Sequence, residues 1–258
     1  MSDNLLIKKD GHITTITINR PDIRNAISDE EMTVALVDAI NDLNRDPDVR
    51  VAILTGAGKV FSAGADIRSR KAVGDTRGGR YQHIRRVRES FHAIRECTKP
   101  VIAAINGPAL GAGLALAASC DILIAAEEAS LGLPEIDVGL LGGGRHSMRL
   151  FAHSRLRRMM FTGYRVPGPE LYRLGVVELC VPRAELMDAA LKLAAEIASK
   201  SPTAMRLAKQ SLNTIEELSL RDGYRYEQNM TLQLSGHPDS QEAMAAFLEK
   251  RKPKFSGS

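Results

Sequence analysis

The sequence predicts an α/β fold in which short buried strands alternate with helices, followed by a largely helical segment. Two short apolar runs, VRVAILTG at 49–56 and KPVIAAING at 99–107, are typical of strands buried in a parallel sheet. Segments with apolar residues at helical spacing separate and follow these runs. Because the strands recur at short intervals, we expect right-handed ββα or βαβ units. The length of 258 residues allows one large domain, or one domain with a small appendage.

The first part of the chain predicts a hairpin and then a helix. NLLIKKDG at 4–11 and HITTITINR at 12–20 are expected to form two strands joined at Asp10-Gly11. Ser28 is expected to be the N-cap of the helix, with Glu31 completing a capping box. Its apolar residues then recur at helical spacing as far as Pro47: Met32, Leu36, Ala39, Ile40 and Leu43.

Further along the chain, strands and helices continue to alternate before helices dominate. We expect a very basic helix over 77–96, a second helix over 111–119 and a strand over 121–126. The charged, glycine-containing segment 69–80 is expected to form a mobile surface loop. From about Ser147 the pattern favours helices, with long candidates at 184–199, 203–218 and 239–250.

The composition narrows the classes of partner. The net charge is +4, and no basic patch with interleaved aromatics is present, so we expect no nucleic acid partner. A polyanionic small ligand and an ordinary solvated surface both fit the mild positive charge. The three cysteines, Cys97, Cys120 and Cys180, are widely spaced and predict neither a zinc site nor a disulfide framework. Because no apolar run reaches the length of a membrane span and the N-terminus lacks a targeting pattern, we expect a cytoplasmic protein.

Two loops of small residues each follow a buried strand. These are GKVFSAGADI at 58–67 and PALGAGLAL at 108–116. Small residues let a ligand approach main-chain N–H groups, and a helix N-terminus adds free donors. Two such groups aimed at one point would form an oxyanion hole. Close helix packing explains either loop equally well when it is taken alone.

Five motifs, taken together, resemble the crotonase superfamily, which is the enoyl-CoA hydratase/isomerase family. In chain order they are RPDIRNAIS, FSAGADI, INGPALGAG, LGLPEIDVG and EAMAAFLEKRKPKF, and they span nearly the whole chain. The resemblance implies a crotonase-type spiral of ββα units over 1–200 that binds and transforms an acyl-CoA thioester. It implies a helical C-terminal oligomerisation region over 201–258 and a homotrimer or hexamer. Coenzyme A as part of the substrate is expected, with no metal and no other cofactor.

The resemblance also implies the catalytic groups. The N–H groups of Ala65 and Ala112 would polarise the thioester carbonyl, and Glu135 would be the acid/base. Family hydratases carry a second glutamate where this chain has Ala115, and usually have glycine at position 112. One carboxylate suffices to move a proton between two carbons, whereas adding water needs more. The sequence therefore favours an enoyl-CoA isomerase.

Other reactions stay open because further polar residues lie near Glu135 in the sequence. Asp137 and His146 are possible accessory groups, and either would supply the partner that a hydratase needs. The same residues, with Arg145, could instead form hydrogen bonds at a helix terminus. The family also includes hydrolases of acyl or β-ketoacyl thioesters, and non-catalytic scaffolds that bind acyl-CoA or RNA. The retained Glu135 argues against a silent scaffold.

The coenzyme A portion of the substrate is expected to contact residues from both ends of the chain. Arg24, and with it Arg68, would face the phosphates. Phe247 and Lys250 would help to close the site of a neighbouring subunit. The residues expected at this subsite are Arg24, Ala63, Asp66, Ile67, Arg68, Phe247 and Lys250.

Overall fold

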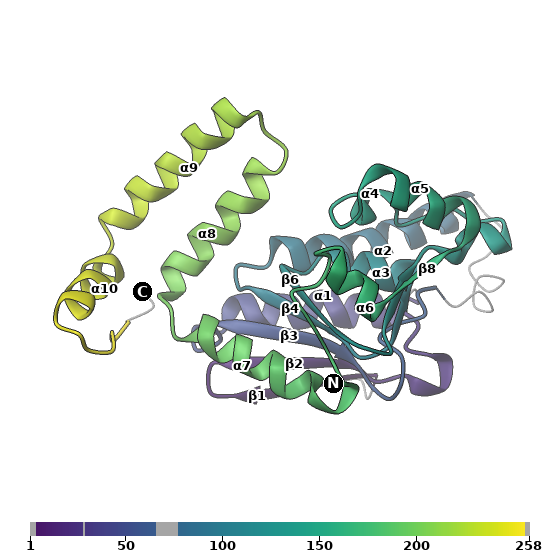
Figure 1. Cartoon of the computed structure of the whole chain (residues 1–258), viewed down its shortest axis with the longest axis horizontal. Coiled ribbons are helices and arrows are strands. Elements are labelled where there is room, and N and C mark those ends of the chain that lie inside the picture. The colour runs from purple at the N-terminus through teal and green to yellow at the C-terminus, as the bar shows by residue number, and fades with distance from the viewer. Residues whose placement is uncertain (1–3, 28, 66–76, 256–258) are drawn as a thin grey trace.

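Two sheets form the centre of the molecule. The computed structural model describes residues 4–27, 29–65 and 77–255, and its arrangement is shown in Figure 1. The larger sheet has the strand order β1-β2-β3-β4-β6-β9, and its β1–β2 pair is antiparallel while the other pairs are parallel. Its strands are β1 (Leu5–Asp10), β2 (Ile13–Ile18), β3 (Val51–Gly56), β4 (Val101–Ile105), β6 (Ile122–Ala126) and β9 (Leu179–Val181).

The smaller sheet makes the fold a spiral. It has the order β5-β7-β8, formed by β5 (Pro108–Leu110), β7 (Ser130–Gly132) and β8 (Arg165–Pro167). The chain passes from β4 of the large sheet directly to β5 of the small sheet and then into helix α3 (Ala112–Ala118). The next turn repeats the step from β6 to β7. The expected ββα units are therefore confirmed.

Helices cover the large sheet so that its central strands are buried. All six residues of β3 and all five of β4 are buried, as expected for a parallel sheet covered on both faces. Helix α7 (Leu186–Ala198) packs on β2, β3, β4 and β6, while α1 (Glu30–Arg45) packs on β1 and against α2 (Arg77–Glu96). The core is largely aliphatic, with Phe61, Phe91 and Phe151 also buried, and this fits the sequence, which has no tryptophan.

The expected cap of α1 is wrong by one residue. Asp29 is the N-cap, and its Oδ1 accepts a hydrogen bond from the Met32 N–H at 3.0 Å. The other carboxylate oxygen of Asp29 pairs with Arg20, so two partners fix the aspartate where it caps the helix. Ser28 and its expected capping-box contact with Glu31 lie outside the described residues, and Glu31 accepts a hydrogen bond from the Asn4 side chain at 2.9 Å.

Shorter helices connect the strands around the small sheet. The turns η1 (Pro21–Ile23), η3 (Pro134–Val138) and η4 (Arg183–Glu185) are 3₁₀ helices. The α-helices of this part are α4 (Gly144–Ser147), α5 (His153–Thr162) and α6 (Gly168–Arg173). The basic helix expected over 77–96 is α2, which begins at Arg77. Residues 69–76 of the expected mobile loop lie outside the described residues.

Three helices at the C-terminus extend away from the sheets, as Figure 1 shows. They are α8 (Pro202–Ile215), α9 (Leu220–Ser235) and α10 (Pro238–Leu248). Helices α8 and α9 pack against each other, and α9 was not expected from the sequence. The Lys209 ammonium anchors α8 to the core because it donates to Asp121 at 2.7 Å and to two main-chain carbonyls. No helix among the described residues is long and apolar enough to cross a membrane.

Candidate active site

Two loops of small residues lie side by side at one end of the small sheet. The Leu110 N–H donates to the Ser62 carbonyl at 2.9 Å, and the Ser62 N–H donates to the Pro108 carbonyl at 3.2 Å. Gly64 has a φ of +85°, and a Cβ there would lie 2.5 Å from the Leu110 carbonyl oxygen and 3.0 Å from the Ala112 nitrogen. Only glycine permits this approach. The structure therefore brings Gly64, the residue before Ala65, beside the Ala112 nitrogen.

Helix α3 presents its N-terminus to this junction. Gly111 precedes it with a φ of +56°, and its N–H donates to the Gly132 carbonyl at 2.9 Å. Residues 113–118 of the helix are buried, while Ala112 is half-buried and Ala65 is exposed. The first N–H groups of a helix have no partner within it, and the dipole there favours a negative ligand. The apolar segment 107–121 thus combines a packed helix with accessible backbone donors at its start.

Glu135 places a carboxylate at the same junction. It lies in η3, directly after β7, and its Oε1 is so close to Gly111 that any Cβ at that position would collide with it. A Cβ at Gly142 would lie 3.6 Å from the same oxygen. The other oxygen, Oε2, is buried and has no hydrogen-bond partner in the part of the chain that the structure describes. Burial raises the pKa of Glu135 above the usual value of a glutamate, so this carboxylate is a better proton acceptor than an exposed one.

Known proteins match both the sequence and the overall fold of this chain. The family model for enoyl-CoA hydratase/isomerase matches residues 8–258. This chain belongs to the enoyl-CoA hydratase/isomerase family. A short-chain-enoyl-CoA hydratase of Clostridium acetobutylicum is 35% identical, covering 97% of this chain and 96% of that protein. An enoyl-CoA hydratase from Bacillus anthracis superposes with a TM-score of 0.93 at 33% identity, covering 99% of this chain and 100% of that one.

One relative carries the name of a different reaction. It is a (7aS)-7a-methyl-1,5-dioxo-2,3,5,6,7,7a-hexahydro-1H-indene-carboxyl-CoA hydrolase of Rhodococcus jostii, 36% identical. The match covers 94% of this chain and 93% of that protein. Membership of the hydratase/isomerase family therefore shows that the chain belongs to an enzyme family with the crotonase fold. It does not show which reaction the chain catalyses, because relatives of similar identity carry the names of different reactions.

Asp137 lies near Glu135 in the sequence, and its carboxylate faces the end of α5 and not Gly111. A Cβ at Gly163 would lie 2.8 Å from Oδ2 of Asp137, so this carboxylate packs against the end of α5. Asp137 is also exposed. A 3₁₀ helix has three residues per turn, so side chains two positions apart point in different directions. The structure brings Glu135, and not Asp137, to Gly111.

His146 lies on α4 and packs against α2. Its ring meets the Phe91 ring edge-on, with centroids 5.2 Å apart and planes at 72°. Burial lowers the pKa of His146, and the nearby positive groups His92 and Arg149 lower it further. The neighbouring Arg145 pairs with Glu217 at 2.7 Å. For Arg145 the structure supports the alternative of an ion pair at the helix terminus.

The residues expected at the coenzyme A subsite fall into three groups. The Arg24 carbonyl accepts a hydrogen bond from the Ala63 N–H at 2.9 Å, so these two residues share the loop next to Gly64, and the Arg24 side chain is exposed. Phe247 and Lys250 lie in and just after α10, which Figure 1 places far from α4 and α5. They are not brought to Glu135 within one chain. Asp66, Ile67 and Arg68 lie outside the described residues.

Sequence reasoning did not single out the residues that shape the junction. Asn25, fully buried, donates through its amide to the carbonyls of Ala57 at 2.9 Å and Val60 at 2.6 Å, and so holds the loop before Gly64. Gly111 gives the Glu135 carboxylate its space. The Arg24-Asn25-Ala26 motif and the repeated glycines are visible in the sequence. The sequence does not show which of these positions makes which contact.

Proposed function

We propose that this enzyme isomerises an enoyl-CoA thioester, moving its double bond from C3–C4 to C2–C3. The observation that carries the proposal is the position of Glu135. Its half-buried carboxylate packs against Gly111, beside the N-terminus of α3, and its buried Oε2 has no hydrogen-bond partner among the described residues. An unsatisfied buried acceptor is costly, and such groups are typical of functional sites.

The backbone donors would bind the thioester carbonyl. In this proposal the N–H groups of Ala65 and Ala112 donate to the carbonyl oxygen, which gains negative charge when the adjacent carbon loses a proton. Donors fixed in place stabilise the resulting enolate more than the neutral carbonyl, and losing one typically costs about 3 kcal/mol. The close contact at Gly64, which sets these two loops side by side, supports this arrangement.

Glu135 would then carry the proton between carbons. Its carboxylate takes a proton from C2, and the electron pair of that C–H bond spreads over the thioester and the double bond. The same proton returns from Glu135 to C4, which leaves the double bond between C2 and C3. The step needs no group beyond the protein and the acyl-CoA itself, and the raised pKa of Glu135 suits a proton that must be both taken and returned.

A hydrolase acting on an acyl-CoA is the second candidate. The Rhodococcus jostii relative that bears a hydrolase name is as similar to this chain as the relatives with hydratase names. The same oxyanion donors would serve it, because an enolate also forms when a C–C bond next to a carbonyl breaks. A hydratase would need a second group to hold the attacking water, and Ala115 supplies none.

Self-association as a homotrimer or hexamer is the second part of the proposal. Large apolar side chains are exposed along the C-terminal helices, where a monomer would leave them in water. They are Leu212, Leu220, Leu232, Met244, Phe247 and Leu248. Burial of this surface against another copy would bring Phe247 and Lys250 to a neighbouring subunit, where the coenzyme A portion of the substrate is expected.

The test compares three acyl-CoA reactions for the native enzyme and Glu135→Gln. We expect conversion of a 3-enoyl-CoA to its conjugated 2-enoyl isomer, no hydration of a 2-enoyl-CoA, and loss of about 10²- to 10⁴-fold in kcat for the variant. The acid limb of the native pH profile should lie above the usual glutamate pKa, because burial raises that of Glu135. Rapid hydration would overturn the isomerase, and free thiol or ring-opened product would favour the hydrolase.

A further inference from the structure

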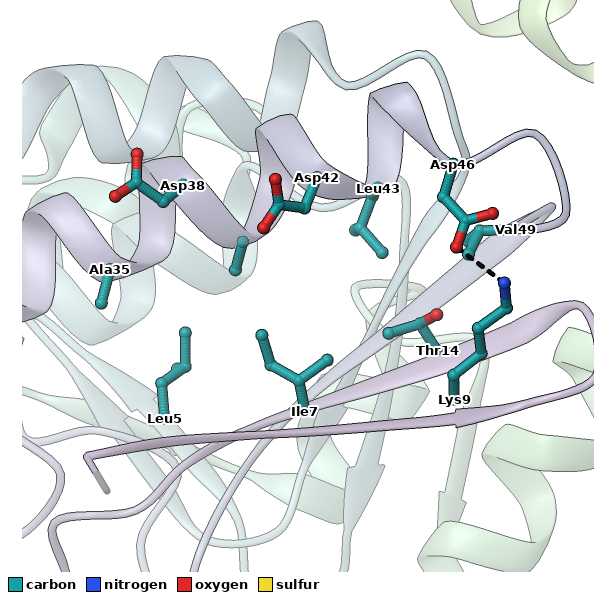
Figure 2. A pocket seen from close by; sticks show the side chains of 11 residues that line it. Leu5, Ile7, Lys9, Thr14, Ala35, Asp38, Asp42, Leu43, Asp46 and Val49 are labelled. Atoms are coloured by element: carbon teal, nitrogen blue, oxygen red, sulfur yellow. Dashed lines mark hydrogen bonds and ion pairs between the residues drawn. The ribbon is translucent and has the colours of Figure 1, made fainter. Parts of the chain in front are cut away.

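A groove lies between helix α1 and the edge strand β1, on the large sheet, whereas Glu135 follows a strand of the small sheet. It has a volume of about 510 Å³. Figure 2 shows Leu5, Ile7 and Lys9 of β1 on one side and α1 on the other. The groove lies at the open edge of the sheet, because β1 pairs with β2 and is the first strand in the order.

The floor of the groove is apolar and its rim is acidic. Leu5, Ala39, Leu43 and Val49 are buried, and Ile7 is exposed. Along the α1 side, three carboxylates follow one another at every fourth residue: Asp38, Asp42 and Asp46. Residues four apart lie on one face of a helix and about 6 Å apart along its axis. The rim is therefore a row of evenly spaced negative charges above a hydrophobic floor.

A buried hydroxyl inside the groove has no partner. Thr14 of β2 is 2% exposed, and its Oγ1 forms no hydrogen bond with any described residue. It pairs across the strands with Lys9, and Figure 2 shows its hydroxyl on the side of the sheet that faces α1. A buried hydroxyl without a partner costs stability, because threonine loses its hydrogen bonds to water. A ligand with a polar hydrogen would restore one of them.

One carboxylate of the acidic rim already binds an ammonium group of the protein. The Lys9 side chain crosses the groove, and its ammonium pairs with Asp46 at 2.7 Å (Figure 2). An alkyl ammonium group therefore already occupies one end of the row. At the other end, no side chain in the described part of the chain pairs with Asp38, and Asp42 is paired with the exposed Arg45 at 3.3 Å. Asp38 therefore remains for a further ammonium group, and a second ammonium would compete with Arg45 for Asp42.

We propose that this groove binds a linear aliphatic di- or polyamine. Four methylene groups place two ammonium nitrogens about 6 Å apart, which matches the spacing of Asp38 and Asp42. The methylene chain would lie on Leu5, Ile7 and Ala39, and an N–H of the amine would donate to the Thr14 hydroxyl. The apolar floor selects against a small inorganic cation, and the row of charges selects against a monoamine.

The test measures binding of 1,4-diaminobutane and spermidine to the full-length protein by calorimetry in an amine-free buffer. We expect saturable binding at one site per chain that weakens with added salt. Butylamine, 1,4-butanediol and magnesium ion should bind at least about tenfold more weakly, since each lacks one part of the match. Equal binding of butylamine or magnesium would overturn the proposal, as would no binding of either amine.

Two variants locate the site. Asp38→Asn with Asp42→Asn should weaken spermidine binding about tenfold, while Asp188→Asn, on the exposed face of α7, should leave it unchanged. Thr14→Val should weaken binding and leave the fold intact, because it removes an unpaired hydroxyl and keeps the shape. Melting curves without amine check folding of each variant. Equal losses in Asp188→Asn would show diffuse charge attraction and overturn the proposal.

Analytical ultracentrifugation tests whether a second copy of the chain, and not an amine, covers the groove. If a second copy of the chain covers the groove, Asp38→Asn with Asp42→Asn would change the assembly state, and spermidine would bind to neither form. That result would overturn the amine site and assign the surface to contacts between subunits. If the groove holds an amine, the assembly state should be the same with and without spermidine and in both aspartate variants.

Discussion

Glu135 and Asp121 are two carboxylates with opposite arrangements of partners. Burial is the largest influence on each, and it raises the pKa of both. Asp121 Oδ2 accepts from the Lys209 ammonium at 2.7 Å and from the Val101 N–H at 2.7 Å. Glu135 Oε2 accepts no hydrogen bond from residues 4–27, 29–65 or 77–255. Asp121 Oδ2 is held by an ammonium and a main-chain donor, whereas Glu135 Oε2 is buried without a partner among the described residues.

This difference distinguishes a carboxylate that stabilises the fold from one that is available to a substrate. Lys209 comes from α8 and also donates to the carbonyls of Ile94 and Lys99, so a single ammonium joins the C-terminal helices to α2 and to the start of β4. A buried charge with a full set of partners supports the fold. A half-buried carboxylate without partners costs stability, and it remains free to accept a proton from a substrate. Three substitutions test this contrast.

The largest effect on stability is expected from Lys209→Met. The change leaves Asp121 without its ammonium partner, and breaking a buried ion pair by removing one member is strongly destabilising. Because the Asp121 side chain is 24% exposed and water can reach it, we expect a loss of about 2 to 3 kcal/mol. Chemical denaturation, followed by circular dichroism, measures the free energy of unfolding.

Two controls keep this result specific. Lys192→Met, on the exposed face of α7, should change the free energy of unfolding by less than about 0.5 kcal/mol. Lys209→Met combined with Asp121→Asn should recover part of the loss, because the uncompensated carboxylate is gone. A single Lys209 variant as stable as the native protein would show that the ion pair does not hold α8 to the core.

Gly111→Ala is expected to impair the site with a smaller effect. Gly111 has a φ of +56°, and a Cβ there would collide with Oε1 of Glu135. A displaced carboxylate should lower kcat by roughly 10- to 100-fold, because small misplacements of a catalytic group are costly. Gly175→Ala is the matched control, since Gly175 also has a positive φ of +69° and its Cβ would meet nothing within 4 Å. Equal activity losses in the two variants would attribute the effect to backbone strain.

The sequence predicted the parts of the fold that depend on local pattern. Strands β3 and β4 are continuous apolar runs, and such runs indicate buried parallel strands. Helix α9 was missed because its one buried residue is Gly223, so no apolar stripe marks it in the sequence. It packs against α8, and that tertiary contact is invisible to periodicity. The cap of α1 was misplaced because Ser28 and Asp29 both suit an N-cap, and the pairing with Arg20 favours the second.

The candidate site could be predicted in its chemistry and not in its geometry. The order of motifs predicted Glu135 as the acid/base, while Asp137 and His146 were possible accessory groups that could instead form hydrogen bonds at a helix terminus. The structure separates them through contacts that only the fold creates: Glu135 against Gly111, Asp137 against Gly163, and the His146 ring against Phe91. The missing partner of Glu135 Oε2 is a property of packing and has no signature in the sequence.

The smallest expected effect is a gain in stability for Glu135→Gln. Burial raises the pKa of Glu135 in the folded protein above its value of about 4.3 in the unfolded chain. Above the folded-state pKa both states are ionised, and the folded state bears the cost of a buried charge. Below the unfolded-state pKa both states are protonated, and that cost is absent. The neutral glutamine should therefore stabilise the protein at pH 7 by about 0.5 to 1 kcal/mol, discounted because the group is only half-buried.

The pH dependence of this gain distinguishes charge from shape. The difference in free energy of unfolding between Glu135→Gln and the native protein should shrink as the pH falls through the folded-state pKa, and vanish near pH 4. Glu178→Gln, an exposed glutamate, should show little difference at any pH. A gain for Glu135→Gln that stays constant with pH would mean that glutamine merely packs better. Glu135 would then not be a strained carboxylate, and the contrast with Asp121 would lose its physical basis.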